Sequence, residues 1–135
     1  MSSKLTLQNA QGMITRAMRK AEQMNVKVSI FVVDSSGIPV AFVRMDGADF
    51  HTMDVARAKA YTAVAYSKNT WDLVDEMKTN PLDANALMQV GRGNVAFIGG
   101  GVLAKKDGEI IGAIGTSGAE ADQDHACGVE AISQI

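Results

Sequence analysis

The chain has 135 residues, of which 47% are hydrophobic and 21% charged, and its formal net charge is −2. This length predicts a single domain over residues 1–135, and the apolar content excludes a mainly disordered chain. The slight negative charge disfavours binding to nucleic acid or to anionic membranes, and no apolar run is long enough to cross a membrane. With one cysteine, Cys127, and no apparent secretion signal, we expect a reduced protein of the cytoplasm.

The first half of the chain predicts a helix, a hairpin and a second helix. Apolar residues recur at three- and four-residue steps over 7–24, which is typical of an amphipathic helix. Two apolar runs, 28–33 and 40–43, flank an Asp-Ser-Ser-Gly turn and predict a β-hairpin. Thr52 is expected to cap a helix over 53–68, whose many alanines would let it pack closely against a sheet.

The second half predicts three further helices and a second hairpin. The helices are expected over residues 71–77, 83–89 and 119–135. An apolar, strand-like segment at 95–98 leads into three glycines, and a hairpin turn over 105–108 then joins two more strands, 102–104 and 109–116. Because both hairpins pair antiparallel strands, the order of elements predicts an α+β fold and not a doubly wound parallel one.

The glycine run Gly99-Gly100-Gly101 interrupts this apolar context. Three residues without side chains weaken a strand, so the run predicts either a simple bend or a close approach. What approaches the main chain there is a ligand or another backbone segment, and the pattern alone does not decide between them.

Three charged residues stand in otherwise apolar surroundings. Arg44 and Asp46 are two positions apart, so on a strand they face the same way and form either a local ion pair or part of a cavity wall. In a cavity, Arg44 would bind a carboxylate through two hydrogen bonds. Lys59 lies within the alanine-rich helix and extends either to solvent or into a polar pocket.

The remaining candidates are two histidines and one serine. His51 and His125 do not form a helical zinc pair, and both are compatible with a solvated helix face. His51 is nevertheless the better candidate for an axial ligand of heme iron, because it precedes a helix in a loop. Ser117 follows a strand and precedes a helix, where its hydroxyl and the backbone amides would donate to a ligand oxygen.

Six segments together resemble the GlcG/HbpS-like family, which also occurs as the C-terminal domain of PduO-type proteins. They are VVDSSG (32–37), PVAF (39–42), RMDGA (44–48), AKAYTA (58–63), GGGV (99–102) and IGAIGTSG (111–118). The segments occur in family order and span nearly the whole chain. One departure is that no proline stands around the three glycines, where the family has two.

This resemblance implies a profilin-like or PAS-like α+β sandwich, with a central antiparallel sheet of about five strands flanked by helices. It also implies a homo-oligomer, and heme or a related tetrapyrrole as the ligand. On this hypothesis the chain is a cytoplasmic small-ligand-binding protein whose pocket lies between the sheet and the second helix. The ligand-binding residues would be Arg44, Asp46, His51, Lys59, Gly99, Gly100, Gly101 and Ser117, with His51 as the axial ligand.

Two other functions remain open. One is an enzyme, a lyase or isomerase, acting on a carboxylate-bearing metabolite: Arg44 would bind the carboxylate, and Lys59, Glu120 or His51 would move a proton. The other is a structural or assembly protein whose cavity stays empty.

Overall fold

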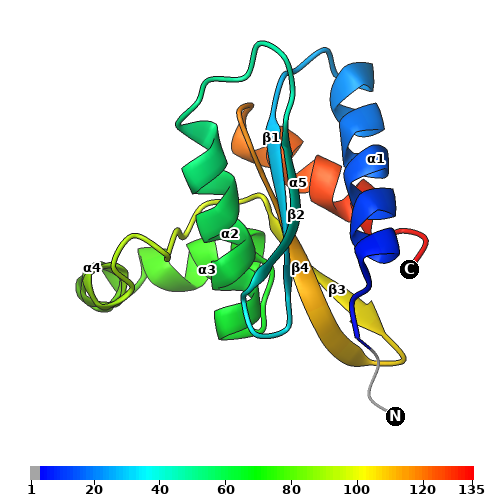
Figure 1. Cartoon of the computed structure of the whole chain (residues 1–135). Helices are drawn as coiled ribbons and strands as arrows, with labels where there is room; N and C mark the ends of the chain where they lie inside the picture. Colours follow the sequence, from blue (N-terminus) through cyan, green and yellow to red (C-terminus); the bar gives the residue numbers. More distant parts are fainter. Residues whose placement is uncertain (1–3) are drawn as a thin grey trace.

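The computed structural model describes residues 4–135 and combines α-helices with an antiparallel β-sheet (Figure 1). Its helices are α1 (Leu7–Gln23), α2 (Thr52–Tyr66), α3 (Thr70–Lys78), α4 (Pro81–Val90) and α5 (Ala121–Ala131). Its strands are β1 (Ser29–Asp34), β2 (Pro39–Arg44), β3 (Gly101–Lys106) and β4 (Glu109–Ser117). The predicted α+β class is therefore confirmed, and the predicted helices and hairpins occur in the predicted order.

The four strands form one antiparallel sheet in the order β2-β1-β4-β3. Helix α2 packs on one face of this sheet, and α1 and α5 pack against each other on the opposite face (Figure 1). β1 and β4 are central, and β4 is buried along most of its length. The sheet thus separates two layers of helices. A side chain that contacts both layers must pass the end of a strand.

The expectation of about five strands is wrong by one, because the apolar segment at 95–98 pairs with no strand. Its backbone is held by α2 instead. The Ala96 N–H donates to the Thr62 hydroxyl at 2.9 Å, and the Arg57 guanidinium donates to the Asn94 side chain at 2.8 Å. Since the Thr62 hydroxyl satisfies a backbone N–H that a sheet would otherwise have to pair, the segment crosses the molecule without joining the sheet.

The start of α2 also differs from expectation. Thr52 is the first residue of the helix, and His51 occupies the cap position without a capping hydrogen bond from its side chain. The Thr52 hydroxyl donates to the Asp49 carbonyl at 2.6 Å and lies 2.8 Å from the Ser29 hydroxyl. Thr52 therefore ties the entry of α2 to β1, and the imidazole of His51 is left free of that task.

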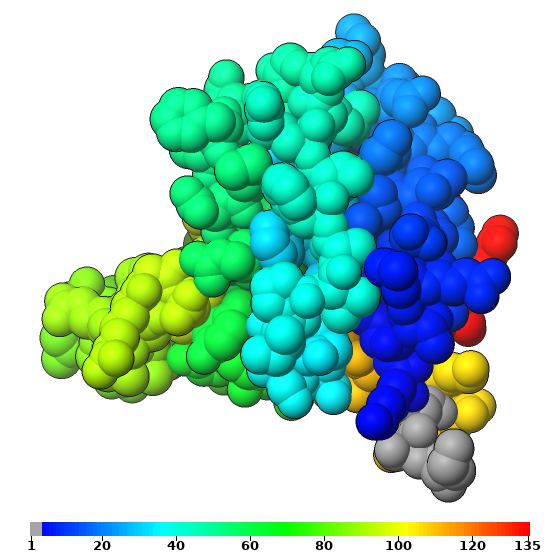
Figure 2. Space-filling model, viewed as in Figure 1, coloured from blue at the N-terminus to red at the C-terminus, as the bar shows by residue number. Residues whose placement is uncertain are grey.

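Helices α3 and α4 project from the body of the molecule, and α4 forms the tip of that projection (Figures 1 and 2). Only Ala84 of α4 is buried, whereas Leu82 and Val90 are 81% and 76% exposed. Such a short helix gains little stability by itself and normally depends on packing of its apolar face. Within residues 4–135, no helix has the length and apolar character needed to span a bilayer.

Cys127 lies on the buried face of α5, and we expect its thiol to be unreactive in the native protein. Burial, assisted by the nearby Asp124 carboxylate, raises the pKa of Cys127 from 9.0 to about 12. A thiol reagent at pH 8 should therefore label the chain only after urea unfolds it. Since the unfolded thiol ionises above about pH 9 while the native thiol keeps its proton, this group should also lower stability as pH rises between 9 and 12.

The fully unfolded chain serves as the control for this experiment, because it must react with one equivalent of reagent. Labelling of the native protein at the unfolded rate would contradict the burial of Cys127.

Candidate functional site

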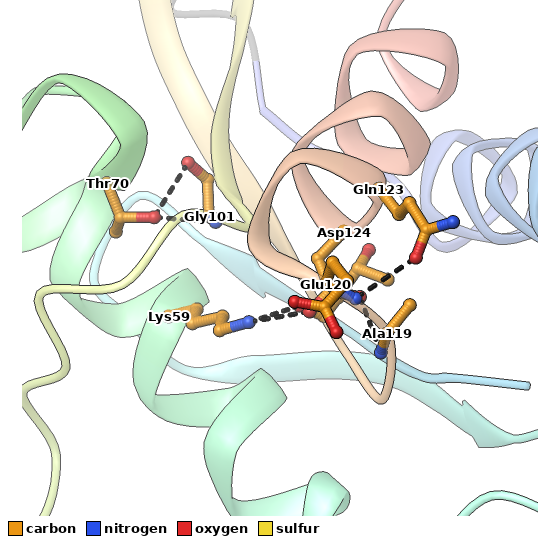
Figure 3. Close-up of polar contacts among 8 residues, drawn as sticks. Lys59, Thr70, Gly101, Ala119, Glu120, Gln123 and Asp124 are labelled. Atoms are coloured by element: carbon orange, nitrogen blue, oxygen red, sulfur yellow. Dashed lines mark hydrogen bonds and ion pairs between the residues drawn. The ribbon is translucent and has the colours of Figure 1, made fainter. Parts of the chain in front are cut away.

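A buried ion pair links the two layers of the fold at the end of β4. The Lys59 ammonium, on α2, lies 3.0 Å from a carboxylate oxygen of Asp124, on α5, and each side chain is only 2% exposed. The same ammonium donates to the Thr116 carbonyl at 2.9 Å. Figure 3 shows Lys59 reaching across toward the first turn of α5. The pair therefore connects elements that pack on opposite faces of the sheet.

The environment of this pair opposes its charges. Burial lowers the pKa of Lys59 and raises that of Asp124, while their mutual attraction and hydrogen bond act against both shifts. The Ala119 N–H donates to the second oxygen of Asp124 at 3.1 Å, which also favours the carboxylate. Because Lys59 is buried and its nitrogen is directed at Asp124 and Thr116, it is not placed to take a proton from a substrate.

The glycine run lies directly against Lys59, but the neighbour is protein and not a ligand space. A Cβ on Gly101 would lie 2.2 Å from the Lys59 carbonyl oxygen, and one on Gly100 would lie 2.8 Å from the Lys59 ammonium. Gly100 and Gly101 therefore let α2 approach the start of β3, which answers the question left open by the sequence. Gly99 is different, because it lies against Trp71 on α3.

Arg44 and Asp46 lie elsewhere, at the exposed end of β2. They line an open hollow of about 500 Å³ together with residues of α1 such as Met18 and Glu22. The Arg44 guanidinium donates to the Ala48 carbonyl at 2.9 Å, which closes the loop after β2. The sequence predicted one pocket for Arg44 and Lys59, but the structure separates them. Lys59 points into the interior and does not line this hollow.

The other predicted residues also separate. His51 is exposed, and in the described part of the chain its imidazole has no hydrogen-bond partner. Ser117 is 7% exposed and pairs with Ser29 in the sheet. Glu120 is exposed and caps α5, where its backbone N–H donates to the Gln123 side-chain oxygen at 3.1 Å (Figure 3). Only Arg44, Asp46 and His51 share one segment, the exposed loop from β2 to α2.

Sequence reasoning missed Asp124 as the partner of Lys59. A signal was present, because Asp124 precedes Cys127, Gly128 and Ala131 by three, four and seven positions, which places it on the buried face of α5. An acidic residue on an apolar helical face requires a partner, and Lys59 was the cation in a matching setting. In residues 4–135 the His, Cys, Asp and Glu side chains form no cluster that could hold a metal ion.

Comparison with known proteins covers almost the whole chain. Residues 5–133 match the profile of a family described as "Haem degrading protein HbpS-like". An uncharacterised 15.0 kDa protein from the dhaT-dhaS intergenic region of Citrobacter freundii is 32% identical over 120 residues, which is 89% of this chain and 84% of that protein.

Two further comparisons involve PduO. The corrinoid adenosyltransferase PduO of Salmonella typhimurium is 33% identical over 123 residues, but the chain spans only 36% of that longer protein. The crystal structure of a PduOC–heme complex matches with a TM-score of 0.90 at 30% identity, covering 98% of this chain and 96% of that one.

Proposed function

Because the chain belongs to the HbpS-like family, we propose that it is a homo-oligomeric protein of the cytoplasm that binds heme or a related tetrapyrrole. The support from relatives is the heme complex of PduOC, which shares this fold over nearly its whole length. The observation in this chain that carries the proposal is His51, an exposed imidazole without a partner in the described residues, next to Phe50, which is 77% exposed.

The residues of the loop from β2 to α2 fit such a ligand. An imidazole nitrogen of His51 is available to bind iron, and the apolar ring of Phe50 can cover part of a porphyrin face. Arg44, on the same segment, carries a guanidinium suited to a propionate, and Asp46 lies beside it in the same hollow. Bound heme would supply redox chemistry at its iron, and the protein's part is to bind and orient it.

The proposal of an oligomer has separate support. A single loop covers only one side of a flat ligand, and a second copy of the chain could cover the other. The projecting helix α4 exposes Leu82 and Val90, which favours burial against another chain. The free, buried thiol of Cys127 fits a reducing compartment such as the cytoplasm.

The enzyme alternative receives less support from the geometry. It requires Lys59, Glu120 or His51 to exchange a proton with a substrate, and the first two have structural roles. Lys59 is 2% exposed and is held by Asp124, and Glu120 caps a helix. Ligand binding at the loop from β2 to α2 does not require Lys59 or Glu120 to leave its present contacts.

A hemin titration tests the proposal. We expect the native protein to sharpen and shift the Soret band, and His51→Ala to weaken hemin binding at least about tenfold, because the iron loses its axial nitrogen. Arg44→Ala should weaken it less, because a propionate at the surface remains solvated.

His125→Ala is the matched control, since the chain has only two histidines and this one, on α5, stacks on Trp71 of α3. It should bind hemin like the native protein, and sedimentation should show that no variant changes the assembly. Equal hemin affinity in His51→Ala and the native chain would remove His51 from the site.

A further inference from the structure

A second hollow lies between α3 and the segment that precedes β3, and no residue of the loop from β2 to α2 lines it. Its volume is about 270 Å³, and its walls include the rings of Trp71 and Phe97 and the side chains of Val74 and Ile98. Ala121, at the start of α5, completes it. The lining is therefore mainly apolar and aromatic, as in sites for small molecules.

Both aromatic walls are held in place by a second ring. Trp71 stacks on His125 with centroids 5.1 Å apart and planes 25° apart, and it remains 43% exposed. Phe97 packs edge-on against Tyr66 at 5.5 Å and 79°. Rings that are already fixed lose little conformational entropy when a ligand stacks on them.

The backbone beneath Trp71 is fixed as well. The hydroxyl of Thr70, the residue before Trp71, accepts the Gly101 N–H at 2.8 Å, which joins the start of α3 to the start of β3 (Figure 3). A Cβ on Gly99 would lie 2.6 Å from the Trp71 ring, so only glycine leaves room for the indole there. Gly99 thus serves the position of Trp71, which gives this glycine a role distinct from that of its two neighbours.

The volume limits the size of the occupant. A cavity of about 150 Å³ holds benzene, and sites for drug-sized ligands measure about 300–1,000 Å³. A hollow of about 270 Å³ therefore suits one ring with a short substituent. It is too small to enclose a tetrapyrrole, which separates this site from the one proposed for heme.

The rim carries one charge of each sign. Asp75 and Lys78, one turn apart on α3, both line the hollow, and within residues 4–135 neither has an ion-pair partner. By contrast, Lys68 and Glu76 nearby are paired at 2.8 Å. Two unpaired charges of opposite sign beside an aromatic slot complement a ligand that carries both an ammonium and a carboxylate.

We propose that this hollow binds a small aromatic zwitterion, of which an aromatic α-amino acid is the simplest case. The ring stacks on Trp71 and Phe97, the carboxylate faces Lys78, and the ammonium faces Asp75. This site does not depend on heme binding.

Fluorescence of Trp71, the only tryptophan in the chain, provides a direct readout. Titration with phenylalanine should change this emission and saturate. Removing one charge from the probe, as in 3-phenylpropionate or phenethylamine, should weaken binding about two- to fivefold, and glycine should not bind. Absence of phenylalanine binding up to about 10 mM, a level that would detect even a millimolar Kd, would overturn the proposal, and so would equal binding of phenylalanine and 3-phenylpropionate.

Calorimetry on variants separates the contributions of the two charges and of the apolar hollow to phenylalanine binding. Asp75→Asn and Lys78→Gln should each weaken phenylalanine binding about two- to fivefold, whereas Lys68→Gln, whose ammonium lies outside the hollow, should leave it unchanged. Ala121→Leu fills the hollow without touching either charge and should abolish binding. If this variant binds phenylalanine like the native chain, the ligand lies elsewhere and the assignment is wrong.

Discussion

Lys59→Met is expected to lower the free energy of unfolding by about 3–5 kcal/mol, because it leaves the Asp124 carboxylate buried without its partner. The carboxylate would retain the Ala119 N–H but lose its counter-ion. Burial already raises the pKa of Asp124, and removal of Lys59 should raise it further. Urea denaturation followed by circular dichroism measures the change in stability.

Two comparisons make this prediction specific. Lys68→Met removes an ion pair whose side chains are 53% and 49% exposed, and should cost less than about 1 kcal/mol. The double variant Lys59→Met with Asp124→Asn should recover at least half of the loss, because no unpaired charge remains buried and the new side-chain amide could still accept the Ala119 N–H through its oxygen. A loss in Lys59→Met no larger than that in Lys68→Met would show that the pair is not buried as described.

The sequence predicted where helices and strands lie along the chain better than it predicted which segments pair with one another. Apolar periodicity located α1 to within one residue of each observed end, because one face of this helix packs on the sheet and that requirement is visible in the pattern. The segment at 95–98 was misassigned since its composition is strand-like, while its Ala96 N–H is satisfied by the Thr62 hydroxyl, far away in the chain. A hydrogen bond from a residue distant in sequence, in place of one from a neighbouring strand, leaves no signal in the local sequence pattern.

The candidate site shows the same limit. Arg44 and Lys59 are both cations in apolar surroundings, and nothing in their spacing tells that one ends an exposed strand while the other crosses between layers. The loop from β2 to α2 was the part of the prediction that the geometry keeps together, because Arg44, Asp46 and His51 are close in sequence. The contact between Lys59 and Asp124, which are far apart in the sequence, could be identified only from the fold.

The glycines of β3 and β4 have a structural role that sequence could only partly anticipate. Gly101 and Gly115 are paired across the two strands. A Cβ on Gly115 would lie 1.9 Å from the Ala56 carbonyl oxygen, and one on Gly101 would lie 2.2 Å from that of Lys59. Together they form the smooth surface on which α2 rests, and the alanines of α2 complete the close approach.

Gly115→Ala should consequently destabilise the protein by about 3 kcal/mol or more, at the upper end for overpacked cores, because the obstacle is helix backbone and no flexible side chain can move aside. The matched control is Gly12→Ala in α1, where the new methyl group would meet only the guanidinium of Arg16 at 3.2 Å, a side chain that also donates to the Ala131 carbonyl at 2.8 Å. That change should alter stability by less than about 1 kcal/mol, since the higher helix preference of alanine offsets a small displacement of the Arg16 guanidinium. Thermal and urea denaturation of the two variants measures both effects. A Gly115→Ala protein as stable as the native chain would mean that α2 does not contact β4 through backbone atoms, and the close packing that holds Lys59 against the end of the sheet would then need another explanation.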